Sequence, residues 1–203
     1  MFDVEIKGVD DALRFAARAP GNAAFALALA LNDTAKAVQT FTVNELLPGV
    51  FTLRARGAPW WRPGTRMGFN IQFAKKDNLT ATLGSQADWL KLQEEGGTKT
   101  ASGHRVAVPE AARPSPTSVI PRANKPRRML DQGKAFKVET DGLALILKPG
   151  ADRNELLYIL TPSTQIRPRL KFVETATDMA EDLIDDNYSR RFVEVMGNEI
   201  ANL

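Results

Sequence analysis

Cysteine is absent from this chain of 203 residues, and histidine occurs only once, as His104. The absence of cysteine excludes disulfides, iron–sulfur clusters, thiolate zinc sites and cysteine nucleophiles. A single histidine excludes multi-histidine metal sites and leaves one candidate base for any Ser–His–Asp arrangement. The side chains on which most metal and redox sites depend are therefore missing.

Long apolar runs are also missing, since the longest, at 23–31, has nine residues. This is too short to span a membrane. The first residues lack the basic and apolar regions of a signal peptide, so we expect no secretion. Hydrophobic residues make up 43% of the chain and charged residues 25%, which is typical of a globular protein and excludes a mostly disordered chain.

The apolar pattern predicts an α+β fold with mostly antiparallel sheets, a long N-terminal helix and a C-terminal helix. Strands are expected at 2–7, 67–73, 79–83, 104–108, 136–138, 143–147 and 156–160. Helices are expected at 9–19, 22–46, 88–95 and 172–195, with one further turn at 127–132. Pro48 and Gly49 should end the second helix, which is alanine-rich. The last three strands should form a meander with a well-buried centre, and Asp141–Gly142 is a typical tight hairpin turn.

Residues 109–126 carry five prolines, which disfavour helix and central strand. We therefore expect one domain with a long extended arm. In this division, 1–96 contains the N-terminal helices and a β-hairpin, 97–134 is the basic proline-rich arm, and 135–203 contains the meander and the C-terminal helix.

Charge is unevenly distributed along the chain, although the net charge is only +3. Residues 54–76 contain six basic residues and no acid, 99–153 contain eleven basic and five acidic residues, and 172–203 contain eight acids and two arginines. Three interpretations stay open. The charges could form a solvated surface, or the basic arm of one copy could pair with the acidic helix of another. Alternatively, 54–76 could bind nucleic acid with Trp60 and Trp61. The small net charge favours subunit pairing over nucleic acid.

Two sets of charged residues are the candidate interface positions. Those of the arm are Arg113, Arg122, Lys125, Arg127 and Arg128. Those of the acidic helix are Asp178, Glu181, Asp182, Asp185 and Asp186. A metal site in such a carboxylate stripe would need histidines or carboxylates from a facing helix, so a solvent-facing surface is favoured.

Signals for catalysis are weak. Ser102 and His104 would share one face of a strand, but neither an orienting carboxylate nor an oxyanion hole is evident. The segment at 96–100, GGTKT, has the wrong glycine spacing for a phosphate-binding loop. We therefore expect no enzyme activity, no catalytic residue, no cofactor and no metal; a hydrolase built on Ser102 and His104 is the last-ranked alternative.

The N-terminal sequence resembles a known family of assembly proteins. Residues 6–13, IKGVDDAL, precede residues 20–35, PGNAAFALALALNDTA. Together they resemble the start of the minor tail protein Z family, the tail-completion proteins of long-tailed bacteriophages. Residues 89–109, with EEGG at 94–97 and VAVP at 106–109, are similar to phage tail and neck proteins. The resemblance covers about a quarter of the chain, and the acidic C-terminal part departs from the very basic tail of the best-known member.

The resemblance implies a non-enzymatic virion component at the head-proximal end of a phage or prophage tail, acting in tail completion and head–tail joining. Its partners would be other tail or neck proteins and copies of itself in a homo-oligomeric ring. Assembly would take place in the bacterial host cytoplasm, close to genomic DNA in the tail lumen, with no membrane and no small-molecule substrate. The alternatives are another tail layer (neck, hub or tail tip) and, more distantly, a DNA-binding protein.

Overall fold

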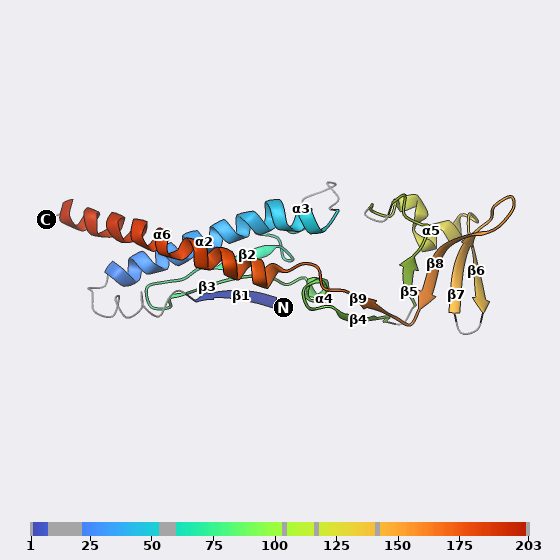
Figure 1. The fold of residues 1–203 in the computed structure, drawn as a ribbon, viewed down its shortest axis with the longest axis horizontal. Coiled ribbons are helices and arrows are strands. Elements are labelled where there is room, and N and C mark those ends of the chain that lie inside the picture. Colours follow the sequence, from blue (N-terminus) through green and yellow to red (C-terminus); the bar gives the residue numbers. More distant parts are fainter. Residues whose placement is uncertain are drawn as a thin grey trace. The chain divides into compact units, whose positions relative to one another are not determined.

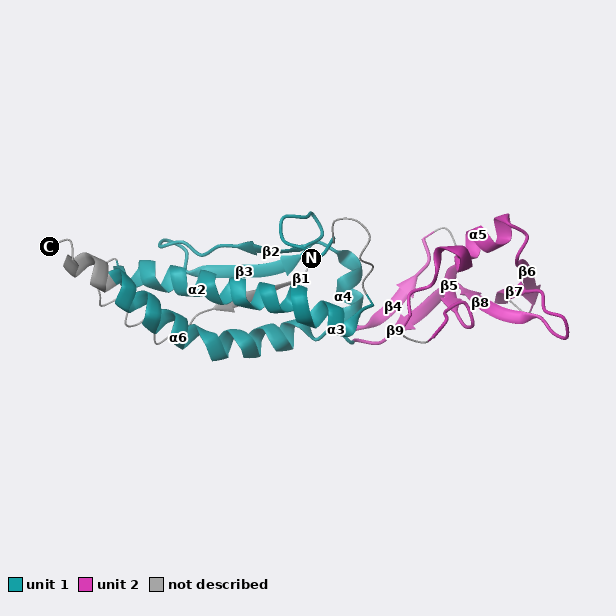
Figure 2. Ribbon diagram, turned by 90° about the horizontal axis from the view of Figure 1, so that it is seen from above, with its two compact units in different colours: residues 1–94, 169–203 teal, residues 95–168 magenta. Residues whose placement is uncertain are grey.

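The computed structural model describes residues 2–7, 22–52, 60–102, 105–115, 118–140 and 143–201, with side chains described from 22 to 195. The expected helix at 9–19 and the turn residues 141–142 lie outside this set, as do Arg54, Arg56 and His104. The chain divides into two compact units (Figure 2): unit 1 comprises 1–94 and 169–203, and unit 2 comprises 95–168. Each unit combines helices with antiparallel strands, so the expected α+β class is confirmed.

The described part of unit 1 contains a three-stranded antiparallel sheet and two long helices (Figure 1). Its elements are β1 (Phe2–Lys7), α2 (Asn22–Phe41), η1 (Thr42–Leu46), α3 (Leu47–Val50), β2 (Phe69–Gln72), β3 (Thr80–Ser85), α4 (Asp88–Glu95) and α6 (Phe172–Ala201). Strand β3 is central, and its Leu83 lies opposite Val4 of β1 and Ile71 of β2. Helices α2 and α6 lie alongside each other, and α2 also contacts β2 and β3. The predicted hairpin at 67–83 is confirmed.

Small side chains on α2 and α6 allow the two helices to pack closely. Helix α2 buries Leu27, Leu31 and Val38 together with six smaller residues. Helix α6 buries a ridge with a spacing of four residues: Phe172, Ala176, Ala180 and Ile184. This spacing places the ridge along one side of the helix. The acidic residues of α6 are left on its remaining surface.

The first long helix extends past its predicted end. After Phe41 the chain continues through the π-helical turn η1 and then α3, which contains Pro48. Pro48 stands at the start of α3, directly after the π-helical turn, and the helical run continues past it. Leu47 is fully buried and anchors this turn, and its carbonyl accepts a hydrogen bond from the Phe51 N–H (2.8 Å). The helical run therefore ends at Val50.

The chain leaves unit 1 after residues 93–94 and returns to it at residues 169–173, and these two segments are hydrogen-bonded to each other. The Gln93 carbonyl accepts hydrogen bonds from the N–H groups of Arg169 (2.7 Å) and Leu170 (2.9 Å). The Glu94 carboxylate accepts hydrogen bonds from the N–H groups of Phe172 (2.8 Å) and Val173 (2.9 Å). Because these two N–H groups lie in the first turn of α6, Glu94 caps a helix 78 residues further along the chain.

Unit 2 contains two antiparallel sheets. The larger has the strand order β5–β8–β7–β6, and the smaller pairs β4 with β9. The strands are β4 (Gly97–Thr100), β5 (Val106–Pro109), β6 (Phe136–Thr140), β7 (Leu143–Lys148), β8 (Glu155–Thr161) and β9 (Ser163–Ile166). The predicted meander is confirmed as β6–β7–β8. The β4–β9 pair is not among the strands predicted from the sequence.

The described part of the proline-rich segment forms short elements that cover one face of the larger sheet. These are η2 (Arg122–Asn124) and α5 (Pro126–Asp131), while Pro109 is the last residue of strand β5 in the sheet itself. Met129 of α5 packs with Ile146 and Tyr158 of the sheet. The Tyr158 hydroxyl donates a hydrogen bond to the Asn124 carbonyl (2.5 Å), and the Asn124 amide donates one to the Ala112 carbonyl (3.1 Å). The helical turn expected at 127–132 is thus present as α5.

The meander is buried on one face only, so its expected well-buried centre needs correction. On β7, Ala144 and Ile146 are buried, whereas Leu143, Leu145 and Leu147 are partly or largely exposed. Helix α5 and η2 cover the side of Ala144 and Ile146. No element in the described part of unit 2 buries the side of Leu143, Leu145 and Leu147.

Candidate interaction surfaces

The arm residues selected from the sequence are exposed in unit 2. Arg122, Lys125, Arg127 and Arg128 follow one another along η2 and α5, and Arg113 lies in the turn after β5. Arg127 forms a long ion pair with Asp131 (3.8 Å), whose two side chains are highly exposed. Such a pair contributes little stability and leaves the arginine accessible. We call Arg122, Lys125, Arg127 and Arg128 the basic cap.

The basic cap is held firmly even though its side chains are exposed. Its backbone is fixed by the hydrogen bonds of Asn124 and Tyr158 described above. Burial raises the pKa of the Tyr158 hydroxyl, and the charge of Arg113 opposes this rise. The hydroxyl therefore stays protonated and can act as a donor. The arrangement presents several cations from a short, anchored helical segment.

The acidic residues selected from the sequence are all exposed on α6 in unit 1. Asp178, Glu181, Asp182, Asp185 and Asp186 point away from the buried ridge of the helix. Asp178 and Asp182 line a shallow hollow that also includes Phe41 and Met179. We call these five acidic residues the acidic stripe; they belong to unit 1, whereas the basic cap belongs to unit 2. Whether they pair between copies stays a prediction.

Further along α6, charged side chains form ion pairs with α2 within unit 1. Asp33 of α2 accepts hydrogen bonds from Arg191 (2.6 Å) and Arg190 (3.0 Å). The hydrogen bond from Arg191 is the main cause that lowers the pKa of Asp33 below its ordinary value. Beside this pair, Asn187 donates a hydrogen bond to the buried Thr34 hydroxyl (2.9 Å). These contacts fix the register of α2 against α6, so both arginines of α6 have a role within the unit.

The basic segment at 54–76 is described from residue 60 onwards, and Arg62, Arg66, Lys75 and Lys76 are exposed there. Its two tryptophans are engaged with other aromatic rings. Trp60 makes edge-on contacts with Trp61 (ring centroids 5.6 Å apart) and Trp89 (4.9 Å), and both Trp60 and Trp61 pack against the unit 1 core.

The turn that follows the tryptophans is tightly hydrogen-bonded. Asn70 accepts a hydrogen bond from the Gly64 N–H (2.8 Å) and donates one to the Thr65 carbonyl (2.9 Å). Gly68 fits only as glycine, because a Cβ there would lie 2.0 Å from the Arg62 carbonyl oxygen. Arg62 and Arg66 are therefore displayed from an ordered turn.

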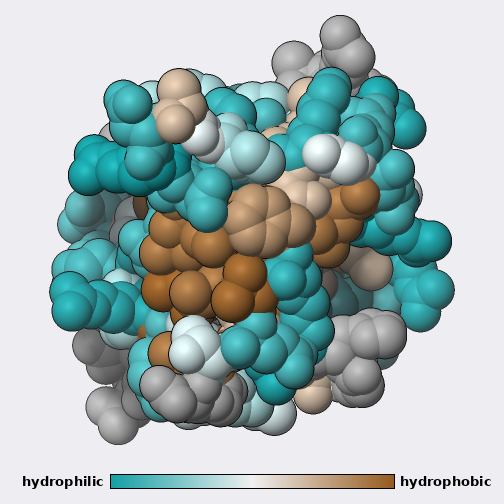
Figure 3. All heavy atoms as spheres, turned by 90° about the vertical axis from the view of Figure 1, so that its right-hand side faces the viewer, coloured by the Kyte–Doolittle hydropathy of each residue, from teal (hydrophilic) through white to brown (hydrophobic). Residues whose placement is uncertain are grey.

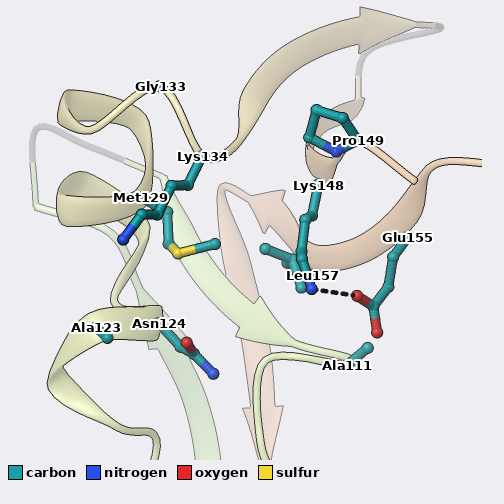
Figure 4. A pocket seen from close by; sticks show the side chains of 10 residues that line it. All are labelled: Ala111, Ala123, Asn124, Met129, Gly133, Lys134, Lys148, Pro149, Glu155 and Leu157. Atoms are coloured by element: carbon teal, nitrogen blue, oxygen red, sulfur yellow. Dashed lines mark hydrogen bonds and ion pairs between the residues drawn. The ribbon is translucent and has the colours of Figure 1, made fainter. Parts of the chain in front are cut away.

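A hollow of unit 2 that combines charged and apolar groups lies between α5 and the margin of the larger sheet (Figure 4). It has a volume of about 500 Å³, with Met129 and Leu157 among its apolar lining. Lys148 forms an ion pair with Glu155 (3.5 Å) at its edge, and Lys134 lies across from them. The lining offers cations and one paired carboxylate, and it contains no nucleophile with an adjacent base.

The remaining chemical candidates are limited. Ser102 is exposed, and His104 lies outside the described residues. Among the residues that the structure describes, no three histidine or carboxylate side chains are grouped so as to hold a metal ion. In the same part of the chain, no helix is both long and apolar enough to cross a membrane.

Comparison with known proteins gave no match to a family model, to a curated protein or to a solved structure.

Proposed function

We propose that the protein is a non-enzymatic structural component of a bacteriophage or prophage tail. It acts in tail completion at the head-proximal end and in head–tail joining, through contacts with copies of itself in a ring and with neighbouring tail or neck proteins. The observation that carries this proposal is the resemblance of residues 6–13 and 20–35 to the minor tail protein Z family.

Two surface features support the proposal. The basic cap offers exposed cations on an anchored segment of unit 2, and the acidic stripe offers exposed carboxylates on α6 of unit 1. Complementary patches of this kind set register and partner choice between subunits, although single exposed pairs add little affinity. In a ring, the basic cap of each copy would contact the acidic stripe of one neighbour, and its own acidic stripe would contact the basic cap of the other. Such a contact between two different surfaces is heterologous.

The direct test is quantitative mass spectrometry on particles purified from the strain that carries the gene, induced if the gene lies in a prophage. The proposal predicts a low, ring-like number of copies relative to the tube protein. Clear absence from intact particles would remove the tail role. Position on the particle, determined by immunogold labelling, separates tail completion from a neck, hub or tail-tip layer.

The contribution of the basic cap is tested by reversing two charges, with Arg127→Glu and Arg128→Glu combined. We expect the variant to fold normally, because both side chains are exposed, and to block tail assembly. Lys75→Glu combined with Lys76→Glu is the matched control, since it makes the same charge change on the exposed hairpin turn of unit 1. Normal tails from the Arg127/Arg128 variant would contradict the role of the basic cap.

DNA binding is the second candidate, because Arg62, Arg66, Lys75 and Lys76 are exposed with no acid between them. Fluorescence anisotropy with a short labelled duplex and a single strand would measure it across a salt series. Binding that weakens with salt and is lost in the Lys75/Lys76 variant would support it. No binding at low salt would exclude it.

A further inference from the structure

The larger sheet of unit 2 has an apolar side that no described element of its unit covers. The strand register places Val138, Leu145, Ile159 and Val108 in one row across all four strands. A neighbouring row contains Phe136 opposite Leu147, which in turn lies opposite Leu156. Side chains two residues apart on a strand point to the same face, so Leu143, Leu145 and Leu147 share one side of β7. A register shift between Ile146 and Leu147 brings Leu156 of β8 opposite Leu147, and hence to the same side as Ile159. We call this surface the apolar face.

Exposure distinguishes the two faces of this sheet. On the side covered by α5 and η2, Ala144, Ile146 and Tyr158 are at most 1% exposed. On the apolar face, Phe136 is 37% and Leu143 is 45% exposed, and the other members are partly exposed. Figure 3 looks onto unit 2 and shows a contiguous hydrophobic patch with hydrophilic residues around it. Patches of this kind on a protein surface are typical of interaction sites.

Charged residues are absent from the described strand positions of the apolar face. The charged residues of strands β6, β7 and β8 lie on the other face of the sheet. There they form ion pairs with one another, Lys137 with Glu139 (2.6 Å) and Lys148 with Glu155 (3.5 Å). On β6, the apolar Phe136 and Val138 thus point away from the core of unit 2, while its charged residues share the core side. This is the reverse of what an antiparallel sheet with one face in water shows.

The sheet of unit 1 provides an internal comparison. Its β3 buries Ala81 and Leu83 and leaves Thr80 and Thr82 on the other side. The neighbouring β2 exposes Asn70 and Gln72 on that outer side. One sheet of the chain therefore has the polar outer surface expected of a solvated face, and the other does not.

We propose that the apolar face of unit 2 packs against the same face of a second copy of the chain. A surface without charges matches a partner surface that is also uncharged, because any ion brought against it would lose its hydration without a counter-charge. The apolar face itself meets this condition, and two antiparallel sheets pack face to face about 10 Å apart. The contact is then isologous and closes as a dimer.

The size of the apolar face is compatible with such a dimer. Four strands spaced about 4.8 Å apart, with about five residues each, cover roughly 300 Å² in projection. Since the accessible area of a side-chain surface exceeds its projection by about half, two faces bury about 1,000 Å² in total, which is near the lower limit for a specific interface. We therefore expect reversible association in the micromolar range rather than a permanent dimer.

The test measures the mass of the full chain by sedimentation equilibrium over a concentration series. Wild-type protein should shift from monomer towards dimer as concentration rises. Leu145→Lys, at the centre of the face, should remain monomeric. Leu143→Lys repeats the test at a more exposed position, where folding is less affected. Val193→Lys is the matched control, because Val193 is an apolar residue of α6 that is 71% exposed and lies in unit 1. Circular dichroism and the thermal midpoint check that each variant is folded.

A second measurement uses the natural absence of cysteine. A chain with the single substitution Leu145→Cys can be cross-linked only to another copy. A short bis-maleimide suits the spacing of stacked sheets, which is too wide for a disulfide. Rapid dimer formation by this variant, with slow cross-linking of Val193→Cys, supports the proposal.

Three results would overturn the proposal. They are a monomeric wild type at all concentrations, equal association of Leu145→Lys, Leu143→Lys and Val193→Lys, and a monomer that instead binds lipid vesicles through this face. The inference does not depend on the tail role, since a dimer can form in solution whether or not the protein is found in particles. Failure of one therefore leaves the other standing.

Discussion

The Glu94 carboxylate should contribute measurably to the stability of unit 1, although it lies outside the helix that it caps. Its two oxygens accept hydrogen bonds from the N–H groups of Phe172 and Val173 (2.8 and 2.9 Å). Substitution Glu94→Ala leaves both donors without this acceptor at the start of a 30-residue helix. Phe172 is fully buried, so water has restricted access to replace the lost bond.

The magnitude follows from the two interactions that are removed. Loss of a capping side chain costs about 0.5–2 kcal/mol. Loss of a negative charge beside a helix N-terminus costs about 0.3–1 kcal/mol more. We expect Glu94→Ala to lower the free energy of unfolding by about 1–3 kcal/mol. Glu94→Gln keeps one acceptor oxygen and should lose about half as much.

Tryptophan fluorescence during urea unfolding is the appropriate assay, because Trp60, Trp61 and Trp89 all belong to unit 1. The signal therefore reports the unit that contains the cap. Glu181→Ala, at an exposed position in the middle of α6, is the control for loss of a glutamate. If Glu94→Ala and Glu181→Ala have equal unfolding midpoints and slopes, the capping role of Glu94 is wrong.

Three further predictions concern contacts within each unit. Asp33→Asn should destabilise unit 1 by about 1–2 kcal/mol at neutral pH, because Arg191 loses a charged acceptor. The pKa of Asp33 is lowered in the folded state, so Asp33 contributes to the free energy of unfolding above its unfolded pKa of 3.8. This contribution is lost as the pH falls through the folded-state pKa. In urea titrations the Asp33→Asn variant should therefore lose less stability than the wild type below about pH 4. Gly68→Ala should lower the thermal midpoint of unit 1, because its Cβ would overlap backbone, whereas Gly49→Ala, which has open space, should leave it unchanged or raise it; equal midpoints would refute this. Tyr158→Phe should destabilise unit 2 by about 1 kcal/mol by removing the anchor of η2, measured by hydrogen exchange of residues in α5, and unchanged protection there would contradict it.

Much of the fold can be predicted from local periodicity. The hairpin of β2 and β3, the meander of β6 to β8 and the last helix follow from alternation of period two and from apolar residues at helical spacing. The β4–β9 pair lacks such a signal, because every residue of β4 is exposed and none is strongly apolar. Its pairing depends on backbone hydrogen bonds between segments more than sixty residues apart, which a local pattern does not encode.

The candidate surfaces could be predicted in part. The charged residues of the basic cap and the acidic stripe were expected on the surface, and they are exposed. The apolar face was missed, because the run from Leu143 to Leu147 reads as a strand buried on both sides. Sequence alone does not show that the covering elements reach only one side. The signal available was the alternation in β6, where Phe136 and Val138 are apolar and Lys137 and Glu139 are charged.

The discontinuous make-up of unit 1 has a consequence for how the protein is made. The ribosome releases unit 2 as one contiguous segment, whereas α2 must wait for α6, which is synthesised after it. At usual translation rates this interval is roughly ten seconds. During that time, unit 2 can close while Leu27 and Leu31 of α2 still lack their partner helix. The nascent chain thus carries an uncovered apolar helix until α6 has been synthesised, and this is the period in which it most needs protection from aggregation.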